Sequence, residues 1–187
     1  MFIEEIGRHL SVSSIAELDK SLKLDKGFWN VVSIREPQVP RPDFLSFAKR
    51  YHEVMCEDRE QVVSDVPSRP PRSEDAIGIF KFVDGHPGEP VLVHCLAGLS
   101  RSPAVALALI LRGMLQSGWD ATKTEPLVER AVDLLLRIRP RARPNVLLLR
   151  LCSGQFLRAM QAHDLAAELL NHPVLMQNRF ATPSEDV

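Results

Sequence analysis

Apolar and polar positions follow one another in blocks along the chain, and this pattern predicts both strands and helices. The segments WNVVSI (29–34) and VLVHC (91–95) are short, apolar and rich in β-branched residues, which is typical of buried strands. YHEVMCED (51–58) is a weaker strand candidate, and DFLSFAKR (43–50) predicts a short helix after a proline-rich loop. Further prolines between 59 and 72 predict a second long loop.

Longer blocks with apolar residues on one face predict four helices in the rest of the chain. The first covers 73–84 and ends before a glycine. The second opens with Ser102 and Pro103 and continues as AVALALILRGML, which is apolar nearly all round and therefore predicts a central helix. Two more helices are predicted, one over 124–138 and a long one from about Val146 toward Leu170.

Strands that alternate with helices indicate an α/β fold in three layers, with a central, mostly parallel sheet flanked by helices. We expect residues 1–187 to form one domain, with 1–25 as an N-terminal extension packed on it or flanking it, and 171–187 as a tail. Within that extension, Ser14 followed three residues later by Glu17 predicts a capping box at the start of a helix.

The charge, the apolar runs and the cysteines of the chain argue against several classes of protein. The formal net charge is −1, so the chain has no overall attraction to nucleic acid or to an acidic membrane. The opening segment MFIEEIGRHL lacks the basic start of a signal peptide, and no apolar run is long enough for a membrane span. Cys56, Cys95 and Cys152 are too few and too far apart for a disulfide framework or a closed zinc site. We therefore expect a cytoplasmic protein.

The candidate chemistry lies where the predicted strand 91–95 meets the next helix. A loop between a strand and a helix start can point several backbone amides at one anion, and the helix N-terminus adds partial positive charge. Cys95 at the first position would favour its thiolate form there, and the Arg101 guanidinium matches two phosphate oxygens. We expect the phosphate to be bound by Leu96, Ala97, Gly98, Leu99, Ser100 and Arg101.

A thiolate beneath a bound phosphate is an in-line nucleophile, so this loop would supply binding and attack together. The loop contains no lysine, which argues against a nucleoside-triphosphate loop. It contains one glycine, whereas a dinucleotide-binding loop needs three.

The segment HCLAGLSRS (94–102) resembles the His-Cys-x-x-Gly-x-x-Arg-Ser/Thr signature of cysteine-dependent protein tyrosine and dual-specificity phosphatases. RIRPRARPNVLLLRL (137–151) resembles the Arg-Pro-x-Ala-x-Pro-Asn segment and apolar helix that follow this signature in dual-specificity phosphatases. The length resembles that of a small bacterial branch of the family. The resemblance implies that the substrate is phosphotyrosine in proteins, with phosphoserine, phosphothreonine or a small phosphoester as alternatives.

The resemblance also implies a role for each residue of the motif. Cys95 would form a phosphocysteine, while an aspartic acid protonates the departing oxygen and later activates water. Arg101 and the loop amides would hold the phosphate, and the Ser102 hydroxyl would stabilise the Cys95 thiolate. His94 would orient the loop without touching substrate. Neither a metal nor another cofactor is implied.

Two residues qualify as the aspartic acid, which the family places on a loop thirty to forty residues before the cysteine. Asp58 directly ends the strand candidate 51–58, and Asp65 precedes prolines in the following loop. We favour Asp58, with Asp65 as the alternative. Asp75 is interpreted as a first-turn helix residue.

Other functions and roles remain open at the level of sequence. A rhodanese-like sulfurtransferase also has a cysteine that opens an anion-binding loop, and a loop without a working acid would bind phosphoproteins without turnover. Lipid-directed phosphatases tend to carry lysines within the loop, and this chain has none there. Asn145 is interpreted as a helix N-cap. The basic run that contains Arg139 and Arg143 is interpreted as a solvated loop, and the family resemblance offers the alternative that one of these two faces the phosphate. Cys56 would be able to trap an oxidised Cys95.

Overall fold

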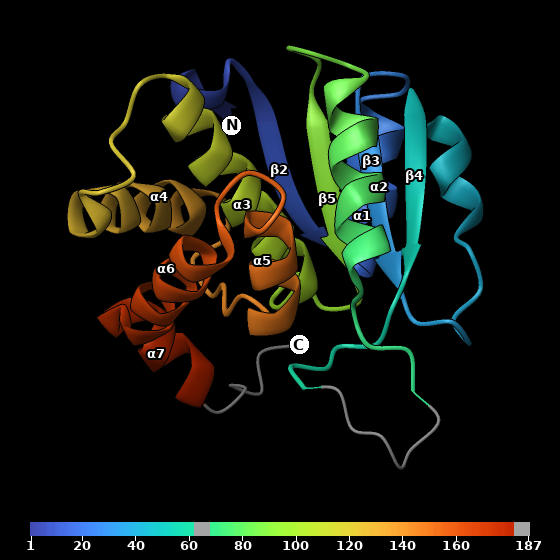
Figure 1. Cartoon of the computed structure of the whole chain (residues 1–187). Coiled ribbons are helices and arrows are strands. Elements are labelled where there is room, and N and C mark those ends of the chain that lie inside the picture. The colour runs from blue at the N-terminus through green and yellow to red at the C-terminus, as the bar shows by residue number, and fades with distance from the viewer. Residues whose placement is uncertain (62–67, 182–187) are drawn as a thin grey trace.

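A five-stranded sheet with helices on both faces forms the framework of the protein, as Figure 1 shows for the computed structural model. The structure describes residues 1–61 and 68–181. The strand order is β1-β2-β5-β3-β4; β1 is antiparallel to β2, and all the other pairs are parallel. The α/β class with a mostly parallel sheet is therefore confirmed. The strands are β1 (Phe2–Ile3), β2 (Arg8–Ser14), β3 (Asn30–Arg35), β4 (Arg50–Met55) and β5 (Val91–Cys95).

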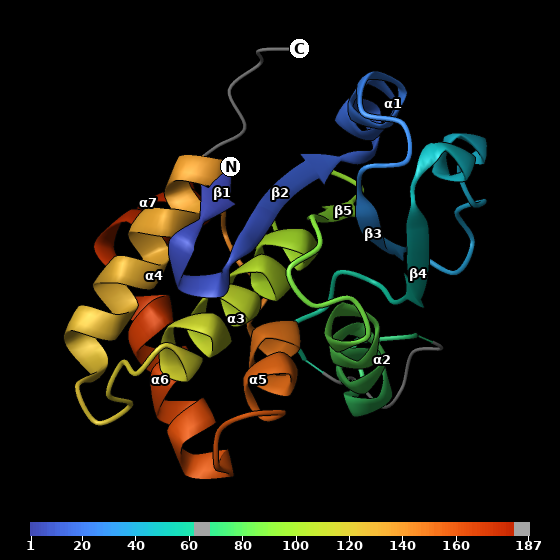
Figure 2. The same cartoon turned by 90° about the horizontal axis from the view of Figure 1, so that it is seen from above.

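The helices form two layers that enclose the sheet, and Figure 2 shows α1 on one face with α2, α3 and α5 on the other. The described helices are α1 (Ile15–Leu24), α2 (Ser73–Asp84), α3 (Arg101–Gln116), α4 (Thr124–Ile138), α5 (Val146–Ser153), α6 (Ala159–Asn171) and α7 (Pro173–Phe180), with short 3-10 turns η1 (Glu4–Ile6) and η2 (Asp43–Phe47).

Alternating side chains on β5 explain why both faces of the sheet are covered. Val91 and Val93 pack into the large core beneath α2, α3 and α5, whereas Leu92 packs into a smaller core with Leu18 and Leu22 of α1. Successive residues of a strand point to opposite faces, so one apolar strand serves two cores. As expected from its composition, α3 is central, because every residue from Arg101 to Leu111 is buried.

The segment 1–25 supplies two strands of the sheet, β1 and β2, and the helix α1. β2 lies beside β5, and their parallel register pairs Leu10 with Val91 and Ser14 with Cys95. We did not predict β2, because Leu10 and Val12 are its only clearly apolar residues and serines separate them. The predicted capping box at Ser14 and Glu17 is present at the start of α1.

Several predicted boundaries need correction. The helix predicted over 43–50 is the 3-10 turn η2, because β4 begins at Arg50. The strand predicted over 51–58 ends at Met55, which leaves Asp58 on a loop. The single helix predicted from Val146 toward Leu170 is two helices, because α5 ends before Gly154, whose backbone entropy disfavours helix continuation.

The C-terminal part of the chain also contains more regular structure than a tail. Helix α7 lies within the segment 171–187, and residues 182–187 of that predicted tail lie outside the described residues. Among the described residues, no helix is long and apolar enough to cross a membrane.

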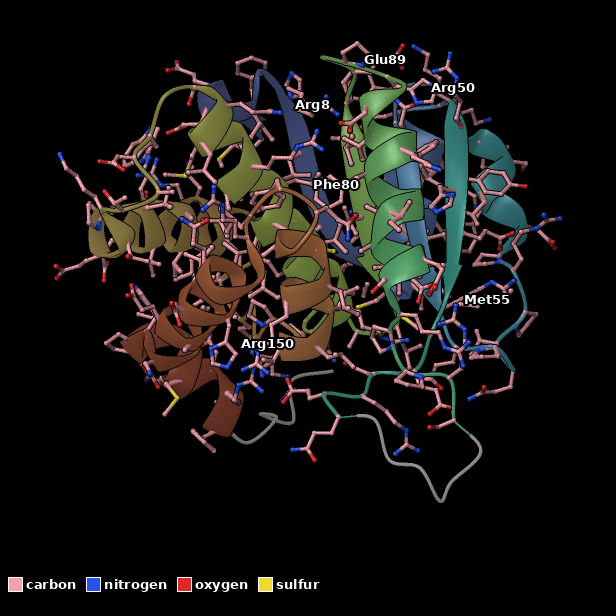
Figure 3. All side chains as sticks on the ribbon, viewed as in Figure 1. Arg8, Arg50, Met55, Phe80, Glu89 and Arg150 are labelled. Carbon is pink, nitrogen blue, oxygen red and sulfur yellow. The ribbon has the colours of Figure 1, made fainter. Side chains whose placement is uncertain are left out.

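The two edges of the sheet differ in what they carry. Figure 3 shows Met55 at the end of β4 on the carboxyl edge, and Arg50 and Glu89 at the opposite edge. There the Glu89 carboxylate accepts hydrogen bonds from the side chains of Arg50 and Asn30, each at 2.9 Å, so polar side chains bonded to one another lie at the amino ends of the strands. The carboxyl edge is left for the loop after β5, as is usual for ligand sites in parallel sheets.

Replacing a buried leucine of β2 tests the placement of this strand inside the sheet. Leu10 is fully buried, and we expect Leu10→Ala to lower the free energy of unfolding by about 2–5 kcal/mol through lost contacts and a cavity. Leu24→Ala is the matched control, because Leu24 is 79% exposed and its loss should cost under about 0.5 kcal/mol. Equal urea midpoints for the two variants would contradict the position of β2.

Candidate active site

The loop from Cys95 to Arg101 lies at the carboxyl edge of the sheet, where β5 ends and α3 begins (Figure 1). Cys95 is the last residue of β5 and its side chain is 2% exposed. The preceding strand is buried throughout and the following helix is buried from Arg101 to Leu111, so the loop is fixed at both ends. The strand–loop–helix unit predicted from the sequence is therefore present.

The carbonyl groups of the loop are bonded to the surrounding protein. The carbonyl of Leu96 accepts from Ile15 N at 3.1 Å, and that of Ala97 from Arg139 Nη2 at 3.1 Å. The carbonyl of Leu99 accepts from Arg143 N at 2.8 Å, and that of Ser100 from Ala104 N at 3.2 Å and Asn145 N at 3.1 Å.

The amides of the same loop have no such partners. Within residues 1–61 and 68–181, no carbonyl or side chain accepts a hydrogen bond from the amides of 96–101. Because the carbonyls point into the protein, these donors are available to a ligand. Together with the first turn of α3 they form a site for an anion.

Gly98 allows the loop to approach the end of β2 closely. Its φ is +70°, which favours glycine, and a Cβ atom there would lie 2.6 Å from Ser14 N and 2.8 Å from Ser13 O. These are backbone atoms, which cannot move aside as a flexible side chain would. The loop is therefore in close contact, at Gly98, with the backbone at the end of β2.

Ser102 contacts the sulfur of Cys95 directly. Its fully buried hydroxyl donates to Cys95 Sγ at 3.1 Å. A donor at this position stabilises negative charge on sulfur, which is what a nucleophile and leaving group requires. The structure brings Cys95 and Ser102 together as the motif predicts.

Arg101 is held in the site by acceptors from two other loops. Its side chain is 2% exposed; Nη1 donates to the carbonyl of Cys56 at 2.6 Å, and Nη2 lies 3.5 Å from a carboxylate oxygen of Glu36. Its Nε is buried and has no acceptor among the described residues. A buried guanidinium with a free donor is suited to bind an oxyanion. Glu36 was not predicted as a site residue.

Asp58 lies over the loop. Its Oδ1 accepts from Ser100 Oγ at 2.7 Å and from Asn145 Nδ2 at 2.8 Å, and its Oδ2 lies 3.8 Å from Arg101 Nε. These contacts join segments that are far apart in sequence and place a carboxyl group beside the Ser100 hydroxyl and the Arg101 guanidinium. The alternative acid, Asp65, lies outside the described residues.

Asp75 is not part of the site. It lies in the first turn of α2, where it accepts two hydrogen bonds of 2.7 Å from Arg69 and one of 2.8 Å from Arg72 N.

His94 supports the loop from the other face of the sheet. Its Nε2 is 2.8 Å from Ser33 Oγ on the neighbouring strand β3, and its side chain is fully buried. Burial lowers the pKa of His94 to about 4, because the charged imidazolium would lose its hydration. A neutral imidazole bonded across two strands is suited to positioning Cys95.

Asn145 and Arg139 have structural contacts that sequence reasoning described only in part. Asn145 is the N-cap of α5, as predicted, because its Oδ1 accepts from Leu148 N at 2.9 Å. Its Nδ2 also donates to Asp58, a contact that no local pattern indicates. Arg139 binds the Ala97 carbonyl and both oxygens of Glu17, at 2.8 and 2.9 Å. It therefore supports the back of the loop, and Arg143 does so through its backbone.

The other two cysteines are buried and unpaired. Burial raises the pKa of Cys56 to about 12, and burial also raises the pKa of Cys152. Both thiols are therefore protonated at neutral pH. Cys56 contributes its backbone carbonyl to the site rather than its sulfur.

Comparison with solved structures shows that this fold is that of dual-specificity and tyrosine phosphatases. The Yvh1 phosphatase domain from Chaetomium thermophilum matches with a TM-score of 0.56 and 20% identity, over 79% of this chain and 89% of that one. The PTP-2 phosphatase of Cydia pomonella has a TM-score of 0.51 and 19% identity, over 82% and 92% of the two chains.

A human tyrosine phosphatase-like serine/threonine/tyrosine-interacting protein has a TM-score of 0.50 and 21% identity, over 84% of this chain and 87% of that one. No protein-family model and no curated protein sequence matches the chain. The resemblance of the motifs is thus confirmed at the level of the fold.

Two glycines with the same backbone conformation test the close contact beneath the loop. We expect Gly98→Ala to lower the free energy of unfolding by about 1–3 kcal/mol more than Gly88→Ala, because its Cβ would overlap the backbone of β2. Gly88 has a φ of +71° with open space around it, so it controls for the conformational strain alone. Equal losses in urea unfolding would contradict the contact with Ser13 and Ser14.

The buried His94 predicts a pH-dependent part of the stability. Its pKa of about 4 lies below the ordinary value of 6.5, so between these two pH values His94 is protonated in the unfolded chain and neutral in the folded protein. The part of the free energy of unfolding that depends on a neutral His94 is fully present above pH 6.5 and is lost as the pH falls toward 4. The free energy of unfolding of the wild type should therefore fall through this window more steeply than that of His94→Gln. Parallel pH profiles would contradict a buried neutral imidazole.

Proposed function

We propose that the chain is a cysteine-dependent phosphatase that hydrolyses phosphate monoesters through a phosphocysteine on Cys95. The observation that carries the proposal is the loop itself: it begins at a buried thiol with a serine hydroxyl on its sulfur, its amides have no acceptor among the described residues, and it ends at an arginine with a free buried donor. The fold also supports the proposal, because the loop lies at the carboxyl ends of the parallel strands, where ligand sites usually lie.

Binding uses groups that are already in place. The amides of 96–101 and the free Nε of Arg101 would donate to the three non-bridging oxygens of the phosphate. Such donors are fixed by the outward bonds of the loop, so little reorganisation is needed when charge shifts onto these oxygens. The bound phosphorus would lie above Cys95 Sγ.

The first chemical step forms the S–P bond as the bond from phosphorus to the leaving oxygen breaks. Asp58 gives its proton to that oxygen, and Oδ2 is the atom suited to this role because Ser100 and Asn145 bind Oδ1. In the second step a water attacks phosphorus, and Asp58 accepts a proton from it. The S–P bond breaks, phosphate leaves, and Ser102 stabilises the returning thiolate.

The substrates we propose are phosphorylated proteins, with phosphotyrosine before phosphoserine and phosphothreonine, and small phosphoesters as model substrates. Three free cysteines suit a reducing compartment, and we propose the cytoplasm.

Hydrolysis of p-nitrophenyl phosphate in excess chelator tests the proposal. Wild type should turn over, Cys95→Ser should be inactive, and Asp58→Asn should lose about 10²–10³-fold in kcat together with the fall in rate at high pH. Asp65→Asn should keep both, since Asp58 is the acid that we propose.

Four outcomes would contradict this proposal or a part of it. Loss of activity in chelator would contradict metal-free catalysis. If the rate of Asp65→Asn no longer decreased at high pH, the general acid would be Asp65 and not Asp58. Absence of turnover, with tungstate still protecting Cys95 from alkylation, would indicate a phosphate-binding module. Turnover of thiosulfate in place of phosphate esters would indicate a sulfurtransferase.

A further inference from the structure

The last described helix, α7, is bonded to the segment that carries Asp58. Arg179 of α7 donates through Nη1 to both carboxylate oxygens of Glu60, at 2.7 and 2.9 Å, and through Nη2 to the carbonyl of Pro144 at 2.8 Å. The Arg179 side chain is 24% exposed and that of Glu60 is 40% exposed. In Figure 1, α7 and the segment after β4 both lie at the lower edge of the molecule.

Glu60 follows Asp58 by two residues, so a bond to Glu60 constrains the backbone beside Asp58. Asn145 provides the other constraint, because its Nδ2 donates to Asp58 Oδ1 at 2.8 Å and to the carbonyl of Arg59 at 3.1 Å. Asn145 and Arg179 thus hold successive residues of this segment: Asn145 binds Asp58 and Arg59, and Arg179 binds Glu60.

Helix α7 is itself fixed to the segment that supports the phosphate loop. Asn178 donates to the carbonyls of Pro140 and Ala142, at 2.9 and 3.0 Å. That same segment supplies the backbone amides of Arg143 and Asn145 to the loop carbonyls. Arg179 therefore connects the segment bearing Asp58 to the support of the loop bearing Cys95.

We propose that Arg179 is a positioning residue for catalysis, which holds Asp58 over the phosphate through Glu60. The proposal rests on the function proposed above, in which Asp58 is the general acid. A half-exposed ion pair contributes little to global stability, but a general acid must lie within hydrogen-bond reach of the leaving oxygen. A displacement of about 1 Å can cost up to about 10²-fold in rate.

Leaving groups of different basicity separate this role from a structural one. A phenol with a pKa of about 10 depends on protonation as it leaves, whereas the more acidic p-nitrophenol depends on it less. We expect Arg179→Gln to lower kcat/KM, which reports the step in which the leaving group departs, about tenfold on phenyl phosphate and less than about twofold on p-nitrophenyl phosphate. Arg179→Lys should have a smaller loss than Arg179→Gln. A lysine keeps the positive charge for Glu60, but its single amino group cannot also bind the carbonyl of Pro144 as the two Nη groups of Arg179 do.

The double variant and a matched arginine complete the experiment. Glu60→Gln should reproduce the selective loss, and Glu60→Gln with Arg179→Gln should be no worse than either single change, because both remove one contact. Arg150 on α5, labelled in Figure 3, is exposed and has no side-chain bond among the described residues, so Arg150→Gln should match wild type on both esters.

Each outcome bears on one proposal or on both. Equal losses on the two esters, additive losses in the double variant, or no loss would overturn the role of Arg179. Asp58→Asn measured beside them distinguishes the two proposals: if it shows the selective loss and Arg179→Gln does not, the proposal for Arg179 alone fails. If Asp58→Asn shows no selectivity, or wild type does not turn over, both fail.

Discussion

The outward direction of the loop carbonyls between Cys95 and Arg101 is the constraint on which the site depends. A peptide group whose oxygen is bonded into the protein must turn its N–H away from that bond. Four loop carbonyls are bonded in this way, to α1, to Arg139, to the 143–145 backbone and within α3. The amides of the loop have no acceptor among the described residues, and a phosphate bound at Cys95 would satisfy them.

The supports of this loop come from segments that are distant in sequence. The end of β2 lies beneath Gly98, and Glu17 at the start of α1 orients Arg139 toward the Ala97 carbonyl. The 139–145 segment approaches from the other side and is held by α7. Residues from both ends of the described chain therefore determine the geometry of a loop in its middle, and the fold serves the site through these contacts rather than through the sheet alone.

The parts of the site that could be predicted from sequence are those encoded locally. Cys95, Gly98 and Arg101 lie within one strand–loop–helix unit, so their spacing indicates an anion-binding loop that begins at a thiol and ends at a guanidinium, and the family resemblance adds the Ser102 hydroxyl next to the sulfur. Their placement in the structure agrees with this interpretation. The α/β class follows from the alternation of strands and helices around that unit, and the resemblance of the motif implies the phosphatase fold.

The remaining features depend on contacts that no local pattern encodes. β2 has only two clearly apolar residues, yet it is a buried strand because β5 pairs with it. The Glu36 approach to Arg101 and the Asn145 bond to Asp58 cross between loops, and their geometry is set by the packing of α3 and α5.

The central claim is that Cys95 becomes covalently phosphorylated during turnover, and trapping this intermediate tests it most directly. Asp58→Asn should slow the hydrolysis step, since the base that activates water is removed. Brief reaction of that variant with a radiolabelled aryl phosphate, followed by denaturation and peptide mapping, should place label on the peptide that contains Cys95. The account predicts label there and none in Cys95→Ser. Steady turnover of the wild type without label on Cys95 in either preparation would contradict it.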